Sequence, residues 1–238
     1  METICVAGIE INVFHRGDDL PSIGVFLLHG RMSKKDHLNH LAFRIAESNT
    51  KLIVFAIDQR NHGSRTINKD KNLDWKSGNS THHLDMWTMQ IGTMMDCCLL
   101  MDLLPLFGYS NIREWGVCGV SMGGHVSLML TGYDNRIKYC VSIIGCLDFM
   151  TLMNLRKPEE IRFKEEYLVS ISKYNAFSNL QKTTAEVLML NGSLDELVPP
   201  EVNQGISEIT NIAYKEFQVA HVLDEEMISD TISYFKSK

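Results

Sequence analysis

The segment 119–123 reads Gly-Val-Ser-Met-Gly and places a serine between two glycines, in the pattern Gly-x-Ser-x-Gly. An apolar run at 115–120 precedes the serine, and a helix-like run at 124–130 follows it. A serine nucleophile has to stand clear of its own backbone, which a sharp turn from strand to helix achieves. Glycine at both flanking positions avoids a collision of side chains in such a turn. The pattern therefore predicts that Ser121 is a nucleophile.

A serine hydroxyl is a weak nucleophile at neutral pH, so Ser121 needs a base beside it. His221 follows the last predicted strand and would take the serine proton and return it to the leaving group. Asp195 lies in a Gly-Ser-Leu-Asp turn and would hold one tautomer of that histidine. Glu196, its neighbour, and Asp148, after the preceding strand, stay open as alternative acids.

Acyl transfer also needs backbone N–H donors that stabilise the negative oxygen of a tetrahedral intermediate. Met122, directly after the serine in the turn that leads into the predicted helix, supplies one donor by its position. The loop after His29-Gly30 supplies the second donor, most simply from Arg31, with Met32 as the alternative.

Short apolar runs alternate along the chain with longer helix-like runs. This alternation predicts an α/β fold with a mostly parallel sheet and helices on both faces. The candidate nucleophile, acid and base all follow predicted strands, where ligands of such sheets bind. The predicted strands are 4–13, 24–29, 52–57, 115–120, 139–145, 187–191 and 213–217, and the predicted helices are 35–48, 84–104, 124–133, 159–174, 200–208 and 224–236.

We expect a single domain over 1–238, with an irregular insertion at about 147–184 that forms a small helical lid. Its apolar residues stand among charges, and we expect Met150, Met153 and Leu155 to contribute to the substrate pocket. Met32 is expected to join them, because its position places it beside the nucleophile.

The composition fits a globular domain with a sizeable core: 238 residues, of which 45% are hydrophobic and 22% charged. The net charge is -6 and no basic run occurs, so nucleic acid is not expected as a partner. No apolar run of membrane-spanning length and no secretory signal is visible, and the six cysteines form no C-x-x-C pair. We therefore expect no membrane span and a cytoplasmic location with free thiols; the sequence does not define the oligomeric state.

Taken together, these motifs resemble the α/β-hydrolase superfamily, and the resemblance covers nearly the whole chain. It rests on the elbow around Ser121, the His29-Gly30 loop, the segment 58–64, and the order serine, aspartate, histidine. Segment 58–64 is similar to a D-x-R-G-H-G-x-S motif of esterases, with Asn61 in place of a glycine. With Asn79 and Asp85, it also resembles uncharacterised fungal hydrolase-like proteins.

The resemblance implies a carboxylesterase-like serine hydrolase that acts on a small to medium, mostly uncharged acyl substrate without a cofactor. Acyl transfer, or cleavage of a thioester, amide or peptide, is an alternative on the same three residues. A binding or sensor protein that turns over slowly is another, since a fold does not fix a function. The His82-His83 doublet and the pair His37 and His40 have no evident third ligand, so no metal site is expected.

Overall fold

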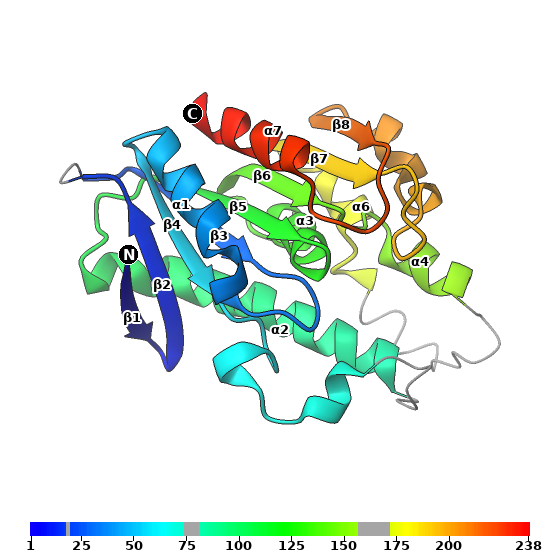
Figure 1. Cartoon of the computed structure of the whole chain (residues 1–238), viewed down its shortest axis with the longest axis horizontal. Helices are drawn as coiled ribbons and strands as arrows, with labels where there is room; N and C mark the ends of the chain where they lie inside the picture. Colours follow the sequence, from blue (N-terminus) through cyan, green and yellow to red (C-terminus); the bar gives the residue numbers. More distant parts are fainter. Residues whose placement is uncertain (18–19, 74–80, 157–171) are drawn as a thin grey trace.

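The structure is a computed structural model that describes residues 1–17, 20–73, 81–156 and 172–238. Eight strands form one sheet in the order β1-β2-β4-β3-β5-β6-β7-β8 (Figure 1). Strand β2 runs antiparallel to both of its neighbours, and all other pairs are parallel. The strands are β1 (Glu2–Val6), β2 (Ile9–His15), β3 (Ile23–Leu28), β4 (Leu52–Ile57), β5 (Glu114–Val120), β6 (Ile137–Ile143), β7 (Glu186–Gly192) and β8 (Ile212–Phe217).

Helices cover both faces of this sheet, so the predicted α/β class with a mostly parallel sheet is confirmed (Figure 1). Helices α1 (Asn39–Ser48) and α7 (Glu225–Lys236) lie together on one face. Helices α2 (His82–Leu103), α3 (Met122–Tyr133) and the short α6 (Ala176–Leu180) lie on the other. One further helix, α4 (Phe149–Arg156), follows β6.

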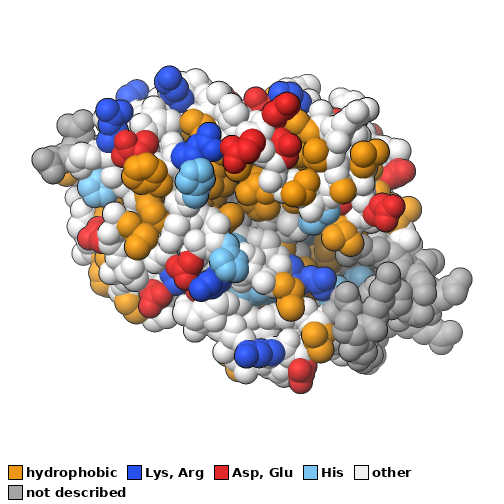
Figure 2. Space-filling model, viewed as in Figure 1, with side chains coloured by type: hydrophobic (Ala, Val, Ile, Leu, Met, Phe, Trp, Pro, Cys, Tyr) orange, Lys and Arg blue, Asp and Glu red, His pale blue; other side chains and the backbone are white. Residues whose placement is uncertain are grey.

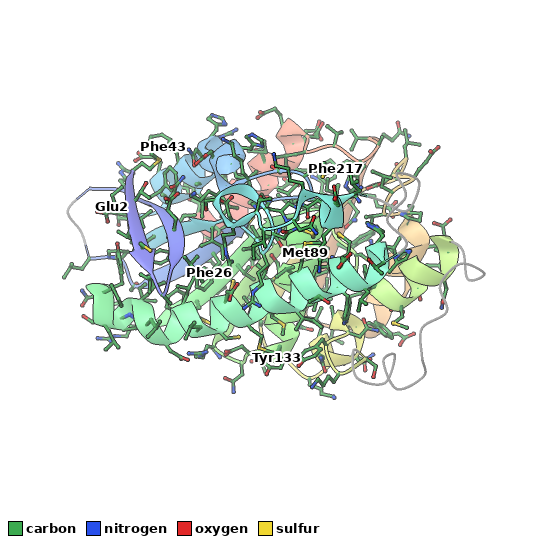
Figure 3. All side chains as sticks on the ribbon, turned by 90° about the horizontal axis from the view of Figure 1, so that it is seen from below. Glu2, Phe26, Phe43, Met89, Tyr133 and Phe217 are labelled. Carbon is green, nitrogen blue, oxygen red and sulfur yellow. The ribbon has the colours of Figure 1, made fainter. Side chains whose placement is uncertain are left out.

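The central strands are buried on both faces because each face packs against its own helical layer. In β3, Phe26 and Leu28 belong to the core beneath α2 and α3, while Val25 and Leu27 belong to the core beneath α1 and α7. Figure 3 shows Phe26 in the layer between the sheet and α2, whereas the exposed ring of Phe43 lies at the periphery. Continuous apolar runs in the sequence are the expected consequence of this double burial.

Two local predictions need correction. The run 4–13 is two strands rather than one, because Ala7 and Gly8 take positive φ angles of 52° and 77° and reverse the chain between β1 and β2. The predicted helix at 200–208 is present with the same bounds, Pro200–Glu208, but its type is 3₁₀. The predicted helix at 159–174 lies mostly outside the described residues, as does the 157–171 part of the expected lid.

Helix α2 and the turn after it are apolar over an unusual length. Within the described residues, His82–Phe107 is the one helix long and apolar enough, by length and composition alone, to cross a membrane. An 18-residue window of it has a mean hydropathy of 1.3. Half of that apolar window is buried inside the fold, which is also typical of the core helix of a globular protein. The expectation that the chain has no membrane span therefore stays a prediction.

Candidate active site

Ser121 stands on the turn between β5 and α3 and has a strained backbone, with φ 56° and ψ −114°. A Cβ added to Gly119 would lie 2.1 Å from the carbonyl oxygen of Gly123, and one added to Gly123 would lie 2.2 Å from that of Leu28. Both glycines are therefore required by close backbone approach, as the pattern predicts. Gly124 is constrained as well, because its Cβ would lie 2.9 Å from the Ile143 oxygen, a point the sequence pattern does not reveal.

The structure brings together the three residues that the sequence singles out, although they lie up to 100 positions apart. The Oγ of Ser121 lies 2.7 Å from Nε2 of His221, and Nδ1 of His221 lies 2.6 Å from Oδ2 of Asp195. Because an ionised carboxylate only accepts hydrogen bonds, Nδ1 carries a proton and Nε2 is left to accept the serine hydroxyl. This tautomer is the one in which a histidine can act as a base toward Ser121.

Asp195 is almost fully buried, with 2% of its surface exposed, and both of its oxygens are used. While Oδ2 faces His221, Oδ1 accepts the backbone N–H groups of Leu197 and Val198, each at 2.8 Å. The turn after β7 thus holds the carboxylate in one orientation. Asp148 instead binds the start of α4 through Thr151 and the N–H of Met150, and the described contacts of His221 include neither Asp148 nor Glu196.

The loop after β3 lies directly against the serine. A Cβ on Gly30 would come within 3.5 Å of the Cβ of Ser121, so this backbone borders the reaction site. Nδ1 of His29 lies 2.7 Å from the Gly30 carbonyl oxygen, and Nε2 of His29 accepts the N–H of Gln59 at 3.0 Å. This buried histidine therefore fixes the peptide plane that precedes Arg31. Met122 is the first residue of α3, where an N–H has no acceptor within the helix.

The cluster after β4 holds this loop in place rather than facing the serine. Asp58 accepts the N–H of Lys35 at 2.7 Å and binds both the N–H and the hydroxyl of Ser64 at 2.9 Å. Arg60 and Asp96 form a two-bonded ion pair at 2.8 and 2.9 Å. On the face shown in Figure 2, basic and acidic side chains are interspersed rather than gathered by sign.

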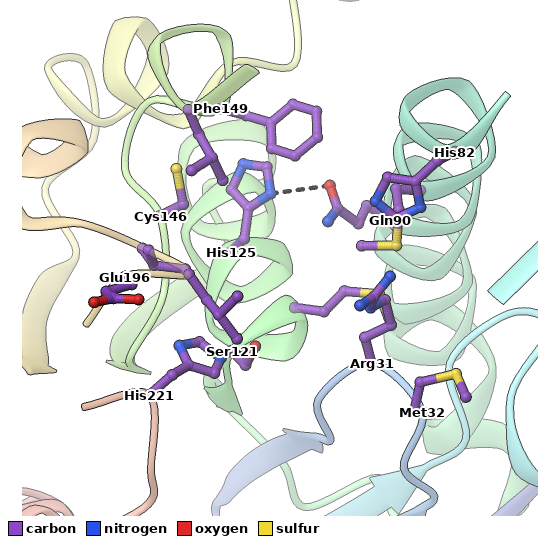
Figure 4. Close-up of a pocket in the computed structure, with 15 residues that line it drawn as sticks. Arg31, Met32, His82, Gln90, Ser121, His125, Cys146, Phe149, Glu196 and His221 are labelled. Carbon is purple, nitrogen blue, oxygen red and sulfur yellow. Dashed lines mark hydrogen bonds between the residues drawn. The ribbon is translucent and has the colours of Figure 1, made fainter. Parts of the chain in front are cut away.

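Ser121 and His221 open into a cavity of about 380 Å³. Its walls come from six parts of the fold: the loop after β3, helix α2, the start of α3, the segment from Cys146 into α4, the turn after β7, and the loop after β8 that carries His221 (Figure 4). Most of the wall is apolar, with polar groups at a few places. The lining residues are Arg31, Met32, His82, Met86, Gln90, Ser121, Met122, His125, Cys146, Phe149, Leu152, Glu196, Leu197, Val198 and His221.

Not all of the expected pocket residues line the cavity. Met32 lines the cavity, although 64% of its surface is exposed. Met150 and Leu155 do not line it: Met150 packs against the core, and Leu155 is 54% exposed. The reason is helical phase, since Phe149 and Leu152, three residues apart on α4, turn to the cavity instead. The side chain of Met153 lies outside the described residues.

Two polar residues deep in the cavity were not expected to line it. His125 lies one turn after Ser121 on α3, and its Nδ1 is 2.9 Å from Oε1 of Gln90 on α2 (Figure 4). The ring of Phe149 stacks on His125 with centroids 5.0 Å apart. The i, i+4 spacing of 121 and 125 could have revealed His125, but nothing local points to Gln90. Within the described ranges, no group of three or more His, Cys, Asp or Glu side chains could hold a metal ion.

We expect the buried histidines to make the fold sensitive to acid. Burial lowers the pKa of His29 to about 4 and that of His125 to about 3, from the ordinary 6.5. Both folded-state pKa values lie below the unfolded value, so their contribution is complete above pH ~6.5. It is lost as the pH falls toward 4, because only the unfolded chain then binds these protons. The slope is about 1.4 kcal/mol per pH unit for each histidine.

Urea unfolding at a series of pH values between 7 and 4 measures this slope. His125→Gln should reduce the slope of the unfolding free energy against pH by up to about 1.4 kcal/mol per pH unit, because one proton fewer is bound on unfolding. His40→Gln, at an exposed position, should leave the slope unchanged. Equal slopes in the wild type and His125→Gln would contradict the pKa lowering.

No protein-family model matches the chain, and no curated protein matches it. Solved structures do. TT1662 from Thermus thermophilus has a TM-score of 0.78 at 17% identity, with 99% of this chain and 96% of that chain covered. Acetyl xylan esterase 1 from Thermoanaerobacterium sp. has a TM-score of 0.70 at 18% identity, with 98% and 80% covered. Est1E from Butyrivibrio proteoclasticus, solved with ferulic acid, has a TM-score of 0.69 at 13% identity, with 100% and 97% covered. With these likenesses and its sheet order, the chain has the α/β-hydrolase fold.

Proposed function

We propose that this chain is a serine hydrolase that cleaves an ester or related acyl bond through an acyl-Ser121 intermediate. The observation that carries the proposal is the hydrogen-bonded series Ser121, His221, Asp195, of which Ser121 and His221 line a cavity. Esterases among the structures of similar fold add support at the level of chemistry.

In the proposed first half-reaction, Nε2 of His221 takes the hydroxyl proton of Ser121 while Oγ attacks the carbonyl carbon. The imidazolium that forms is stabilised by the carboxylate of Asp195, 2.6 Å from Nδ1. The proton then moves from Nε2 to the alcohol oxygen, the bond from the carbonyl carbon to that oxygen breaks, and the acyl group stays on Oγ.

In the second half-reaction, water replaces the alcohol. Nε2 of His221 takes a proton from the water, whose oxygen attacks the acyl carbon. The bond to Oγ of Ser121 breaks as the proton returns to Oγ, and the carboxylic acid leaves. The same base therefore serves both steps, and no further reactant is required.

The N–H groups of Met122 and Arg31 are proposed to stabilise the oxyanion in both steps. Met122 is suited because it begins α3, where the helix dipole also favours negative charge. Arg31 follows Gly30, whose backbone borders Ser121 and whose carbonyl is held by His29. In a trans peptide the C=O and N–H groups lie in one plane and point in opposite directions, so a Gly30 carbonyl that points to His29 directs the N–H of Arg31 away from His29.

The substrate is proposed to be a small to medium acyl ester. A cavity of about 380 Å³ is at the lower end of the usual range for ligand pockets, and methionine, leucine and phenylalanine form much of its wall. We further propose that 1–238 form a single domain and that 147–184 act as a lid. The contribution of Phe149 and Leu152 from α4 to the cavity wall supports the second point.

The proposal is tested with a series of p-nitrophenyl esters of increasing acyl length. We expect hydrolysis of short and medium esters and a decline in kcat/KM once the acyl group exceeds the cavity. The matched control is the Ser121→Ala protein under the same conditions. Hydrolysis of no ester by the wild type, with no acyl-enzyme on denaturing quench and mass spectrometry, would contradict the proposal.

A further inference from the structure

Gln90 contributes a hydrogen-bonding group to the cavity wall that the proposed mechanism does not use. The residue is 2% exposed, and its side chain projects from α2 into the cavity that contains Ser121 (Figure 4). Its Oε1 is engaged by Nδ1 of His125 at 2.9 Å. Within the described residues, the hydrogen bonds of the Gln90 side chain involve this oxygen and not the amide nitrogen. A buried amide whose donors face a ligand cavity points to a polar group on the ligand.

The orientation of this amide follows from His125. Nε2 of His125 is buried and has no partner among the described residues. If Nε2 carried the proton, a buried N–H donor would be left without an acceptor, which is rarer in proteins than an unused acceptor. The proton therefore belongs on Nδ1 and is donated to Oε1 of Gln90. The amide nitrogen, with its two N–H groups, is then the atom that faces the cavity.

Two features keep this arrangement constant. Phe149 stacks on the imidazole at an interplanar angle of 15° and fixes the ring. Burial lowers the pKa of His125 to about 3, so the ring is neutral and its Nδ1–H is a donor at neutral pH. Gln90 is thus held as a donor before any ligand enters.

The position of Gln90 indicates which part of an ester it meets. His221 has to reach the alcohol oxygen, so the alcohol part lies on the His221 side of Ser121. Gln90 and His125 lie across the cavity from His221 (Figure 4). His125 is one helical turn from Ser121, a rise of about 5.4 Å, which a short acyl chain can span. The acyl part therefore extends toward the Gln90 amide.

We propose that Gln90 donates a hydrogen bond to an oxygen on the acyl group, so that the site prefers oxygen-substituted acyl esters to alkyl esters of the same length. This inference rests on the proposed serine hydrolase function. The oxygen is that of an ether, hydroxyl or keto group.

The test compares p-nitrophenyl methoxyacetate with p-nitrophenyl butyrate, which differ by an oxygen in place of one methylene. The methoxy group raises the intrinsic reactivity, so the ratio of kcat/KM values is divided by the ratio of the rate constants for hydroxide hydrolysis. We expect the corrected ratio for the wild type to be about 3 to 10, the effect of one neutral hydrogen bond. A corrected ratio of 1 or less would overturn the assignment without the need for any variant.

A pair of variants locates the effect. Gln90→Met removes the donor at similar side-chain length and should bring the corrected ratio close to 1. Met86→Leu, one turn earlier on α2 and also on the cavity wall, should keep the ratio of the wild type. An unchanged ratio in a folded Gln90→Met protein, with hydrolysis of both esters intact, would overturn the role of Gln90 and leave the proposed function standing. Hydrolysis of neither ester by the wild type would overturn both.

Discussion

Ser121→Ala should lower kcat for ester hydrolysis by about 10⁴-fold or more, because no other group can form the acyl-enzyme. The change removes only the Oγ that lies 2.7 Å from His221, and alanine tolerates the same turn nearly as well as serine. We therefore expect the melting temperature to stay within a few degrees of the wild type. Steady-state hydrolysis of p-nitrophenyl acetate measures the loss, and thermal unfolding by circular dichroism controls for folding.

Ser142→Ala is a matched control for this change. Ser142 is buried on β6 beside Gly124, and its hydroxyl has no hydrogen-bond partner among the described residues. Its removal should leave kcat within a few-fold of the wild type. Comparable losses in Ser121→Ala and Ser142→Ala would show that general damage to the sheet, rather than a missing nucleophile, explains the result.

Asp195→Asn should have the second-largest effect, a loss of about 10³- to 10⁴-fold in kcat. The aspartate uses one oxygen for His221 and the other for the N–H groups of Leu197 and Val198. An asparagine has only one acceptor oxygen and cannot serve both sides. If its oxygen stays with the loop, its NH₂ faces Nδ1 and favours the histidine tautomer that cannot accept the serine proton. If it turns over, two backbone donors lose their acceptor.

The kinetics of Asp195→Asn are best compared with those of Asp148→Asn, since Asp148 is the other carboxylate that follows a strand. Asp148 holds the start of α4 and has no described contact with His221, so its loss should reduce kcat far less. A larger loss of kcat in Asp148→Asn than in Asp195→Asn would show that the acid is Asp148, after β6, and not Asp195, after β7. Crystal structures or hydrogen exchange of the 193–199 turn would then be needed to explain the result.

The sequence predicts those features of the fold that depend on neighbouring residues. The apolar runs predict the central strands because β3, β4 and β5 are buried on both faces. The glycine spacing predicts the turn at Ser121, because the crowding there involves the backbone of the same turn and of the adjacent β3. The reversal at Ala7 and Gly8 is not predicted, since both flanking strands carry similar apolar residues and merge into a single run.

The cavity wall is less predictable than the elements that build it. An apolar residue on α4 faces either the cavity or another surface according to the phase of the helix, which composition does not fix; Phe149 and Leu152 therefore take the place expected for Met150 and Leu155. Gln90 and His125 are 35 positions apart in the chain, and their hydrogen bond joins α2 to α3. No local pattern encodes such a contact, and only the packing of α2 against α3 reveals it.

Covalent labelling with a fluorophosphonate, followed by peptide mass spectrometry, measures directly whether Ser121 is an activated nucleophile. The reagent reacts with a serine whose hydroxyl is activated by a neighbouring base, and it does not require the natural substrate to be known. We expect one adduct, on Ser121, that is absent from Ser121→Ala and forms much more slowly in Asp195→Asn. A wild-type protein that stays unlabelled, or that carries the adduct at another residue, would contradict it.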